Sequence, residues 1–289
     1  MNSGDGWTTC ALGHRHWGLF GAAGLLLRTP PTQDRAVGLQ LRADRSHHGG
    51  TWGILGGARH EDETAVEAAL REAGEEATVD LDQVRVEASY VDDHGGWAYT
   101  TIVASASSTM PLAPRNWESD AVRWVPLPEV DGLALHPGFA TTWPLLRDVG
   151  PAPVLVVDAA NVMGSRPDGW WRDRAGAARR LRDQLAAVPE GLPARDLATV
   201  APDGVRSFPA VVLVVEGQAH GTESVDGVEV VSATGSGDDA IVEEVSRRRT
   251  VDRPVRVVTA DRELRARVED LGAQVLGPRT LLDLLSRPA

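Results

Sequence analysis

The sequence of 289 residues contains one cysteine and no lysine. The single Cys10 cannot form an intrachain disulfide, and the lack of lysine excludes Schiff-base chemistry and a P-loop, because both depend on a lysine side chain. Long hydrophobic runs are also missing, since no stretch approaches the roughly 18 apolar residues of a membrane helix. No basic segment precedes the short apolar stretch 22–27, as it would in a signal peptide. We therefore expect a cytoplasmic protein with no membrane partner.

The charged residues are mainly acidic, with a formal net charge of −12. This charge argues against a surface coated in nucleic acid, although a local basic groove is compatible with it. The length suits two ordinary domains, and glycine and proline punctuate the chain at 148–153. We expect a first domain over 1–148 and a second over 151–289.

The two halves differ in their hydrophobic pattern. In the first half, one strong helix at about 63–77 interrupts alternating runs that predict half-buried strands of a mixed or antiparallel sheet, at 37–41, 84–90 and 97–103. In the second half, helical stretches separate short β-branched runs at 154–157, 211–215, 228–231, 255–258 and 274–276. Alternating strands and helices predict a parallel sheet covered on both faces.

The helix at 63–77 carries three carboxylates on one face, because Glu72, Glu75 and Glu76 are spaced i, i+3, i+4. A separate apolar stripe predicts packing onto the sheet and consists of Val66, Ala69, Leu70 and Ala73. Three like charges repel each other, and a hard divalent cation such as Mg²⁺ or Mn²⁺ would turn that repulsion into a binding site. On the carboxylates alone, a solvated acidic face is an equal alternative.

The spacing over 57–79 resembles the Nudix box, G-x5-E-x7-R-E-U-x-E-E-x-G-U, where U is aliphatic. The matching residues are Gly57, Glu63, Arg71, Glu72, Glu75, Glu76 and Val79. The resemblance spans about 18–147 and implies an α/β/α sandwich around a mixed sheet. Two positions depart from the pattern: Ala73 fills an aliphatic position, and Thr78 replaces a glycine that usually ends the helix in the left-handed conformation. We expect this helix to end in a different way.

The Nudix resemblance implies a metal-dependent pyrophosphohydrolase acting on a nucleoside diphosphate linked to another moiety. Glu72, Glu75 and Glu76 would hold the metal with a carbonyl of Gly56 or Gly57, and the ion pair of Glu63 and Arg71 would orient the site. The metals would neutralise the diphosphate and polarise water. The base would be one of these glutamates or Glu118, for which an ordinary loop acid is an equal alternative. Three tryptophans are candidates for base stacking or simple packing, namely Trp52, Trp97 and Trp117.

Acidic residues also follow strands in the second half. Asp158 and Asn161 follow the first run and Asp261 a later one, and a helix opens with Asp238 and Asp239. Ligands of open α/β sheets bind at the carboxyl ends of strands, so these acids predict a second metal site for phosphodiester chemistry. Helix capping by Asp238 and Asp261 is the alternative.

The order V-V-D-A-A-N, G-D-D-A-I, V-T-A-D-R-E-L resembles the NYN family of PIN-like nucleases, particularly its YacP-like branch, over about 153–285. The resemblance implies a PIN-like Rossmannoid sheet, RNA as substrate, and magnesium among Asp158, Asn161, Asp238 or Asp239, and Asp261. Arginines near 172–182 and 247–249 are candidates for phosphate contacts, with a solvated helix face as the simpler interpretation.

Together these patterns predict a Nudix pyrophosphohydrolase fused to an NYN-like RNA-processing domain. The alternative is a C-terminal ribonuclease with the Nudix domain as a nucleotide sensor, and a homo-oligomer is compatible with either. Cys10, His14 and His16, with His47 and His48 later, are a weak zinc candidate because three ligands at this spacing match no standard structural pattern. A thiol nucleophile at Cys10 is weaker still.

Overall fold

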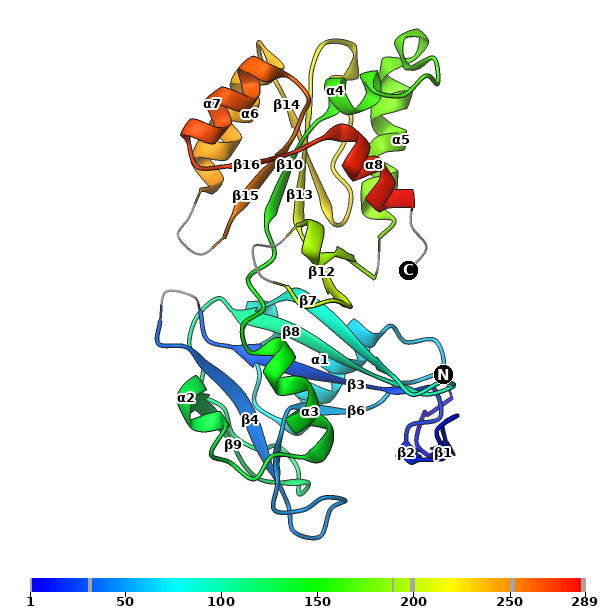
Figure 1. Ribbon diagram of the computed structural model, residues 1–289, viewed down its shortest axis with the longest axis vertical. Helices are drawn as coiled ribbons and strands as arrows, with labels where there is room; N and C mark the ends of the chain where they lie inside the picture. Colours follow the sequence, from blue (N-terminus) through cyan, green and yellow to red (C-terminus); the bar gives the residue numbers. More distant parts are fainter. Residues whose placement is uncertain (1, 31–32, 189, 198–200, 250–252, 287–289) are drawn as a thin grey trace. The chain divides into compact units, whose positions relative to one another are not determined.

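The computed structural model describes residues 2–30, 33–188, 190–197, 201–249 and 253–286. The chain divides into two compact units (Figure 1). Unit 1 comprises Met1–Gly150 and Val200–Val205, and unit 2 comprises Pro151–Thr199 and Arg206–Ala289. Within the described residues, no helix has both the length and the apolar character needed to cross a membrane.

Unit 1 is built on a mixed sheet, as predicted. At its centre, β3 (Ala22–Arg28) pairs parallel with β8 (Ala98–Ala106) and antiparallel with β4 (Ala36–Arg42) and β6 (Leu55–Ala58). The outer strands are β7 (Val84–Asp93) beside β8, with β5 (Trp52–Gly53) and β9 (Ser119–Pro126) beside β4. A separate hairpin consists of β1 (Trp7–Thr9) and β2 (Arg15–Trp17).

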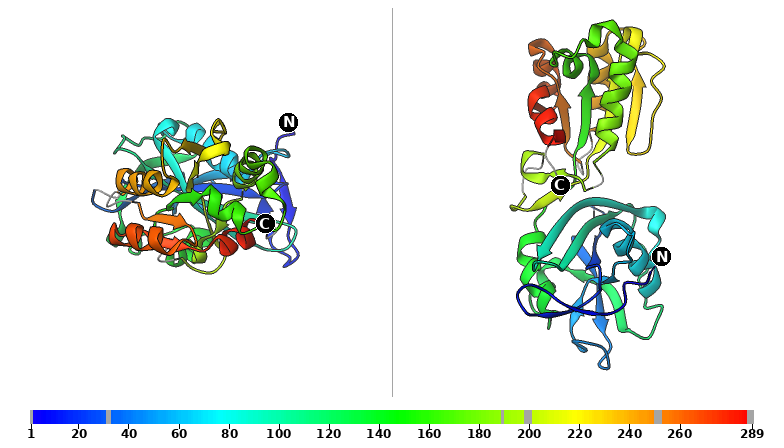
Figure 2. Two further views of the ribbon diagram at one scale, coloured as in Figure 1. Left: turned by 90° about the horizontal axis from the view of Figure 1, so that it is seen from above. Right: turned by 90° about the vertical axis from the view of Figure 1, so that its right-hand side faces the viewer.

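The central strands β3, β4 and β8 are buried over most of their length, so the prediction of half-buried strands is wrong for β4 at 37–41 and for most of β8 at 97–103. The reason is that helices cover both sides of the sheet. The α1 helix (Ala65–Glu76) lies on one side and α3 (Pro137–Leu146) on the other (Figures 1 and 2). Two short segments complete the unit, namely η1 (Leu81–Gln83) and α2 (Leu127–Val130).

The α1 helix begins with a capping box, in which Thr64 and Glu67 each bond the other's backbone N–H. Its buried alanines, Ala68, Ala69 and Ala73, belong to the core that contains the inward side chains of β3 and β6. The predicted stripe is therefore confirmed, because Ala69 and Ala73 are buried and the partly buried Val66 and Leu70 pack against the same core. Small side chains let the helix lie close to the sheet, which brings its acidic residues next to the β6 backbone.

The end of α1 explains how threonine is accommodated at position 78, where the Nudix box has glycine. The cap residue Ala77 is extended (φ −142°, ψ 164°) rather than left-handed. The Thr78 N–H donates to the Ala113 carbonyl at 2.9 Å, and the Ala113 N–H donates to Thr78 Oγ1 at 3.0 Å. These two hydrogen bonds with a distant segment of the same chain hold the backbone just after the helix end, so Glu76 remains the last helical residue.

Unit 2 contains a parallel sheet covered on both faces, which confirms the predicted arrangement. Its strand order is β14 (Val228–Ser232), β13 (Ala210–Val215), β10 (Val154–Asp158), β15 (Val255–Val258) and β16 (Gln274–Leu276). One face packs against α4 (Ala159–Gly164), α5 (Arg174–Ala186) and α8 (Pro278–Ser286). The other packs against α6 (Gly237–Arg248) and α7 (Arg262–Asp270) (Figure 1). Shorter elements of the chain are η2 (Trp170–Arg172), β11 (Leu192–Pro193), η3 (Ala194–Asp196), β12 (Val205–Ser207) and η4 (Gly217–Ala219), and the first residue of β12 belongs to unit 1.

The strand order of unit 2 reverses beside β10. The chain first adds β13 and β14 on one side of β10, then crosses to add β15 and β16 on the other. Such a switch point leaves a crevice outside the carboxyl ends of the two strands that meet there. Asp158 is the last residue of β10, and Asp261 lies three residues after the end of β15.

The arginines at the C-terminal end of α6 are engaged in ion pairs. Glu244 is buried and accepts hydrogen bonds from Arg247 at 2.5 Å and Arg248 at 2.8 Å, and Arg248 also meets Glu229 of β14 at 2.6 Å. Arg249 donates to the Leu271 carbonyl. These contacts tie α6 to neighbouring elements at the end opposite to Asp238, and they argue against a role for 247–249 in binding phosphate at the acidic residues.

We expect Glu244→Gln to destabilise unit 2 by about 1–3 kcal/mol at neutral pH, because two arginines lose a charged acceptor. Burial acts to raise the pKa of Glu244, but the hydrogen bonds from Arg247 and Arg248 lower it on balance. The carboxylate therefore stabilises the fold above its ordinary pKa of 4.5, and this contribution is lost as the pH falls through the lower folded-state pKa. Urea unfolding across this range should show the two proteins converging in acid; a constant difference would contradict the prediction.

Candidate functional site

Arg71 is the centre of a network at the start of the acidic face of α1. Its Nε and Nη2 donate to the two carboxylate oxygens of Glu63 at 2.8 and 3.0 Å, and Nη2 also donates to the Ala58 carbonyl at 2.9 Å. Its Nη1 donates to Glu72 at 2.8 Å and lies 3.4 Å from Glu75. The hydrogen bond with Arg71 is the main cause of a lowered pKa at Glu63. One guanidinium thus fixes three acidic side chains.

The carboxylate of Glu72 lies directly against Gly57 of β6. A β-carbon at Gly57 would come within 2.6 Å of the carboxylate carbon, which no real contact allows. A side chain at position 57 would therefore push the Glu72 carboxylate away from β6, and glycine leaves room for it. Glu75, in contrast, has a side chain that is 59% exposed and faces solvent beside Arg71.

Glu76 turns inward instead of sharing the exposed face. Its side chain is buried, and Oε2 accepts hydrogen bonds from the Gly56 N–H at 2.7 Å and from Gln40 Nε2 at 3.2 Å. Gln40 is itself fully buried and is held by Ser119 and the Ile54 carbonyl. The carboxylates of Glu72 and Glu76 thus contact two successive glycines of β6, Gly57 and Gly56.

The raised pKa values of the glutamates around β6 reflect both their burial and their mutual repulsion. Burial raises the pKa of Glu76 to about 8, and repulsion from Glu72 and Glu118 adds to the shift. Burial also raises the pKa of Glu72, with repulsion from Glu75 and Glu118 opposing the effect of Arg71. Glu118 immediately precedes β9, next to Ser119, and acts electrostatically on both glutamates. Four acids from two separate segments therefore form one region of negative potential.

The three tryptophans have different environments. Trp97 is buried, stacks on His16 with ring centroids 3.8 Å apart, and donates from Nε1 to the Gly18 carbonyl. It is a packing residue and is not free to stack on a base. Trp52 is half-buried under the guanidinium of Arg123. Trp117 is 60% exposed and adjoins Glu118 in sequence, so it is the most accessible of the three.

We expect Arg71→Lys to lower hydrolytic activity by about 10–100-fold, the range typical of residues that orient metal ligands. A lysine ammonium has no planar fork and cannot bond Glu63, Glu72 and the Ala58 carbonyl at once. Arg35→Lys is the matched control, since Arg35 is exposed and contacts Asp148 and the Arg147 carbonyl. Steady-state kinetics would decide, and equal activity in the two variants would contradict a positioning role.

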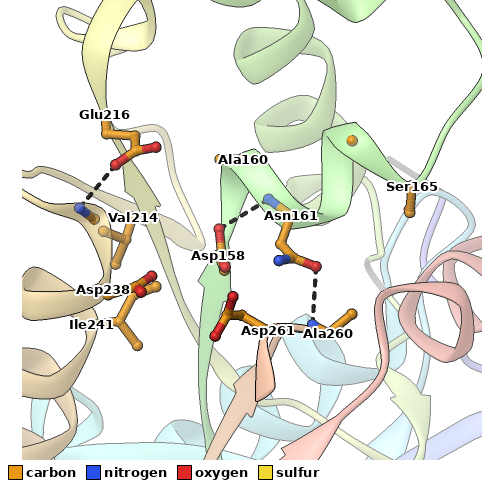
Figure 3. A pocket seen from close by; sticks show the side chains of 12 residues that line it. Asp158, Ala160, Asn161, Ser165, Val214, Glu216, Asp238, Ile241, Ala260 and Asp261 are labelled. Carbon is orange, nitrogen blue, oxygen red and sulfur yellow. Dashed lines mark hydrogen bonds between the residues drawn. The ribbon is translucent and has the colours of Figure 1, made fainter. Parts of the chain in front are cut away.

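The second acidic constellation surrounds a cavity of about 490 Å³ in unit 2. Asp158, Asn161, Glu216, Asp238 and Asp261 all line it, and Figure 3 shows their side chains around the same space. The cavity lies at the carboxyl ends of β10 and β15, where the strand order reverses. Residues that are far apart in sequence meet here because parallel strands end at the same edge.

Three hydrogen bonds hold the end of β10, and two of them join it to the segment that follows β15. Asp158 accepts from the Asn161 N–H through Oδ1 and from Thr259 Oγ1 through Oδ2, both at 3.0 Å. The side-chain carbonyl of Asn161 accepts from the Ala260 N–H at 2.9 Å (Figure 3). Burial raises the pKa of Asp158, and repulsion from Asp238 and Glu216 adds to it. Asp158 is thus rigidly held in a negatively charged cavity.

The sequence predicts a metal site that includes Asp238, Asp239 and Asp261, with helix capping by Asp238 and Asp261 as the alternative, and the structure differs at two of these residues. Asp239 does not line the cavity; its Oδ1 pairs with Arg267 at 2.6 Å and its side chain is 71% exposed. Asp238 does not cap α6, because the cap residue is Ser236. Asp261 caps α7 by accepting from the Leu264 N–H and also lines the cavity, so capping and site roles coexist in that residue.

Sequence reasoning missed Gln40 and Thr259, which orient Glu76 and Asp158. Each is a fully buried polar residue. A polar side chain inside an apolar strand, as in 36–42, was the available signal for Gln40. Thr259 gave no comparable signal, because threonine is common at the ends of strands.

Comparison with known proteins agrees with the geometry of unit 1. The family model of the NUDIX domain matches residues 19–149. The Mycobacterium tuberculosis protein named "Putative 8-oxo-dGTP diphosphatase 3" is 48% identical over 158 residues, which are 52% of this chain and 72% of that protein. A "Nucleoside triphosphate pyrophosphatase/Nudix hydrolase fusion protein" from Bifidobacterium longum is 43% identical over 146 residues, which are 49% of this chain and 30% of that protein.

Among solved structures, the Nudix hydrolase RenU from M. smegmatis is 45% identical. The match covers 50% of this chain and 94% of RenU, with a TM-score of 0.47. Enzymes of this family generally use divalent cations and act on nucleotide-derived small molecules. By the match to the NUDIX domain model and to the Mycobacterium tuberculosis protein, the chain belongs to the Nudix family and is a hydrolase of phosphoric anhydride bonds.

Proposed function

We propose that unit 1 hydrolyses the anhydride of a nucleoside diphosphate linked to another moiety. The observation that carries this proposal is the placement of Glu72 and Glu76 on Gly57 and Gly56, with Glu118 acting on both. A phosphoanhydride brings more negative charge to this region. Such a substrate therefore needs a cation to bridge it to the acids.

The residues present fit a divalent cation. The donors are the carboxylates of Glu72, Glu75 and Glu76 and the backbone carbonyl of Gly56, and such all-oxygen sets suit Mg²⁺ or Mn²⁺. A cation would relieve the repulsion that raises the pKa values of Glu72 and Glu76. When bound, it supplies charge neutralisation of the diphosphate and polarisation of a water molecule.

The protein side chains then have separate tasks. Arg71, held by Glu63, fixes the carboxylate of Glu72 and limits the motion of Glu75. Glu118 is half-buried beside the proposed ligands, and we assign its carboxylate the proton of the attacking water. The hydroxyl adds to phosphorus, the anhydride P–O bond breaks, and the proton leaves with the released phosphate or nucleotide.

The name of one relative supports the proposed substrate class, since that protein is named as a diphosphatase of a modified deoxynucleoside triphosphate. A nucleoside triphosphate is a nucleoside diphosphate linked to phosphate, so it falls within the proposed class. Trp117 supports this assignment, because an exposed aromatic ring next to the proposed base is suited to stack on a nucleobase, typically for about 1–3 kcal/mol.

A substrate panel on the whole chain of 289 residues tests this proposal. Nucleoside triphosphates including 8-oxo-dGTP, nucleotide sugars, dinucleotides and capped RNA would be incubated with Mg²⁺ or Mn²⁺ and with chelator. We expect cation-dependent release of a nucleotide from at least one class. An intact panel would reject hydrolysis, and calorimetric binding without turnover would favour the alternative of a nucleotide sensor.

Unit 2 supports a second candidate function, cleavage of RNA by an NYN-like nuclease. The specific observation is the cavity at the strand switch point, lined by Asp158, Glu216, Asp238 and Asp261. Carboxylates and the Asn161 amide are suitable ligands for magnesium, which would offset their mutual repulsion. Incubation of labelled RNA with and without Mg²⁺ tests it, and RNA that stays intact in both would reject it.

A further inference from the structure

Two turns of unit 1 meet at a cluster of nitrogen and sulfur ligands. Cys10, His14 and His16 come from the β1–β2 hairpin, and His94 comes from the turn between β7 and β8. One ligand atom from each of the four residues lies within 4.8 Å of all the others. His47 and His48 are not members, since their rings contact Trp7, each other and His136.

Two imidazole nitrogens in the cluster are buried without a hydrogen-bond partner, His16 Nε2 and His94 Nδ1. Burying an imidazole nitrogen with no hydrogen-bond partner costs free energy. Two such nitrogens in one cluster therefore indicate that a ligand binds there. The other nitrogen of His94, Nε2, lies 3.3 Å from Asp92 Oδ2. A carboxylate behind a histidine is the usual partner of a metal-binding imidazole, because it sets the tautomer and the ring orientation.

The backbone holds this cluster in place from both sides. In the hairpin, the Cys10 N–H donates to the His14 carbonyl at 3.0 Å, and Gly13 takes a positive φ of 81° in the turn between them. The Ala11 N–H donates to the Gly95 carbonyl at 2.8 Å, which joins the two turns next to His94. His16 is held by stacking on Trp97. The four ligands are thus positioned before any ion binds.

We propose that Cys10, His14, His16 and His94 form a structural zinc site. One thiolate and three imidazoles are a four-ligand set of the kind that closes a tetrahedral zinc centre without an open position. Nitrogen and sulfur donors separate this site chemically from the all-oxygen acidic sites. Its task would be to fasten the β1–β2 hairpin to the main sheet, because a hairpin of two three-residue strands is marginal alone. The closed shell also argues against Cys10 as a nucleophile.

X-ray absorption spectroscopy on the unmodified chain of 289 residues, purified with zinc and freed of loosely held metal, is the direct test. We expect one zinc per chain, with one sulfur at about 2.3 Å and nitrogen neighbours at about 2.0–2.1 Å. Cobalt substitution should add a thiolate-to-metal absorption band, which only Cys10 can supply because it is the single cysteine. A zinc shell with no sulfur, or no retained zinc, would overturn the proposal without depending on any variant.

Variants locate the metal and separate this site from the proposed active site. Cys10→Ser and His94→Gln should each lose the zinc and lower the Tm by more than about 5 °C. The exposed His220 of unit 2 provides the matched control His220→Gln, which should keep both zinc and Tm. Glu75→Gln should also keep its zinc. Zinc that remains in His94→Gln and disappears in Glu75→Gln would show that the ion occupies the acidic site instead.

Discussion

Replacing Glu75 by glutamine is expected to lower the kcat of nucleotide hydrolysis by at least about 10²-fold, with folding stability within about 0.5 kcal/mol of wild type. The substitution keeps the size of the side chain and removes its charge. A neutral amide holds a hard divalent cation poorly, so loss of one carboxylate should cost the several kcal/mol that such an ion contributes to charge stabilisation.

Stability should be unaffected because of where Glu75 lies. Its side chain is 59% exposed, and its contact with Arg71 is a 3.4 Å ion pair. Exposed pairs of this kind contribute little, since solvent screens them. Glu75 is therefore a cleaner test than Glu76, whose buried carboxylate also holds the Gly56 backbone and Gln40.

Glu67→Gln is the matched control for Glu75→Gln, because it makes the same change in the same helix. Glu67 lies in the first turn and closes the capping box, a role that glutamine also fills. Kinetics with saturating Mg²⁺ and a thermal melt would be measured for both. If Glu75→Gln turned over substrate as fast as Glu67→Gln, the proposed ligand set would be wrong at that position.

Replacing Asp158 by asparagine is expected to lower RNA cleavage by unit 2 at least about 10²-fold while leaving nucleotide hydrolysis unchanged. Asparagine retains an oxygen to accept from the Asn161 N–H. The Thr259 hydroxyl, which now donates to Oδ2, can accept from the new amide instead. The geometry is thus preserved, and the charge proposed to bind magnesium is lost.

Asp226→Asn controls for loss of one negative charge in unit 2, since Asp226 is exposed in the turn before β14. Labelled RNA would be followed on gels, and a nucleotide substrate would be assayed in parallel on the same preparations. Wild-type RNA cleavage by Asp158→Asn would remove the cavity as a nuclease site. A parallel loss of nucleotide hydrolysis would instead show that the substitution had disturbed the whole chain.

Much of the fold was determined by local pattern in the sequence. The acidic helix, the parallel strands of unit 2 and the aspartates after β10 and β15 are all readable over short windows, because hydrophobic periodicity sets which faces are buried. The resemblance to the Nudix box implied the ion pair of Glu63 and Arg71, which forms through two hydrogen bonds in the structure. Each of these features depends on residues within about two helical turns or one strand.

Tertiary structure decided the features that depend on distant segments. It brought Glu118 to the acids of α1, let the 113–114 segment close the helix after Thr78, and turned Asp239 toward Arg267. It also added His94 to the ligands of the β1–β2 hairpin. Which side chains meet across a sheet or between turns depends on register and packing over the whole unit, and no local spacing encodes that.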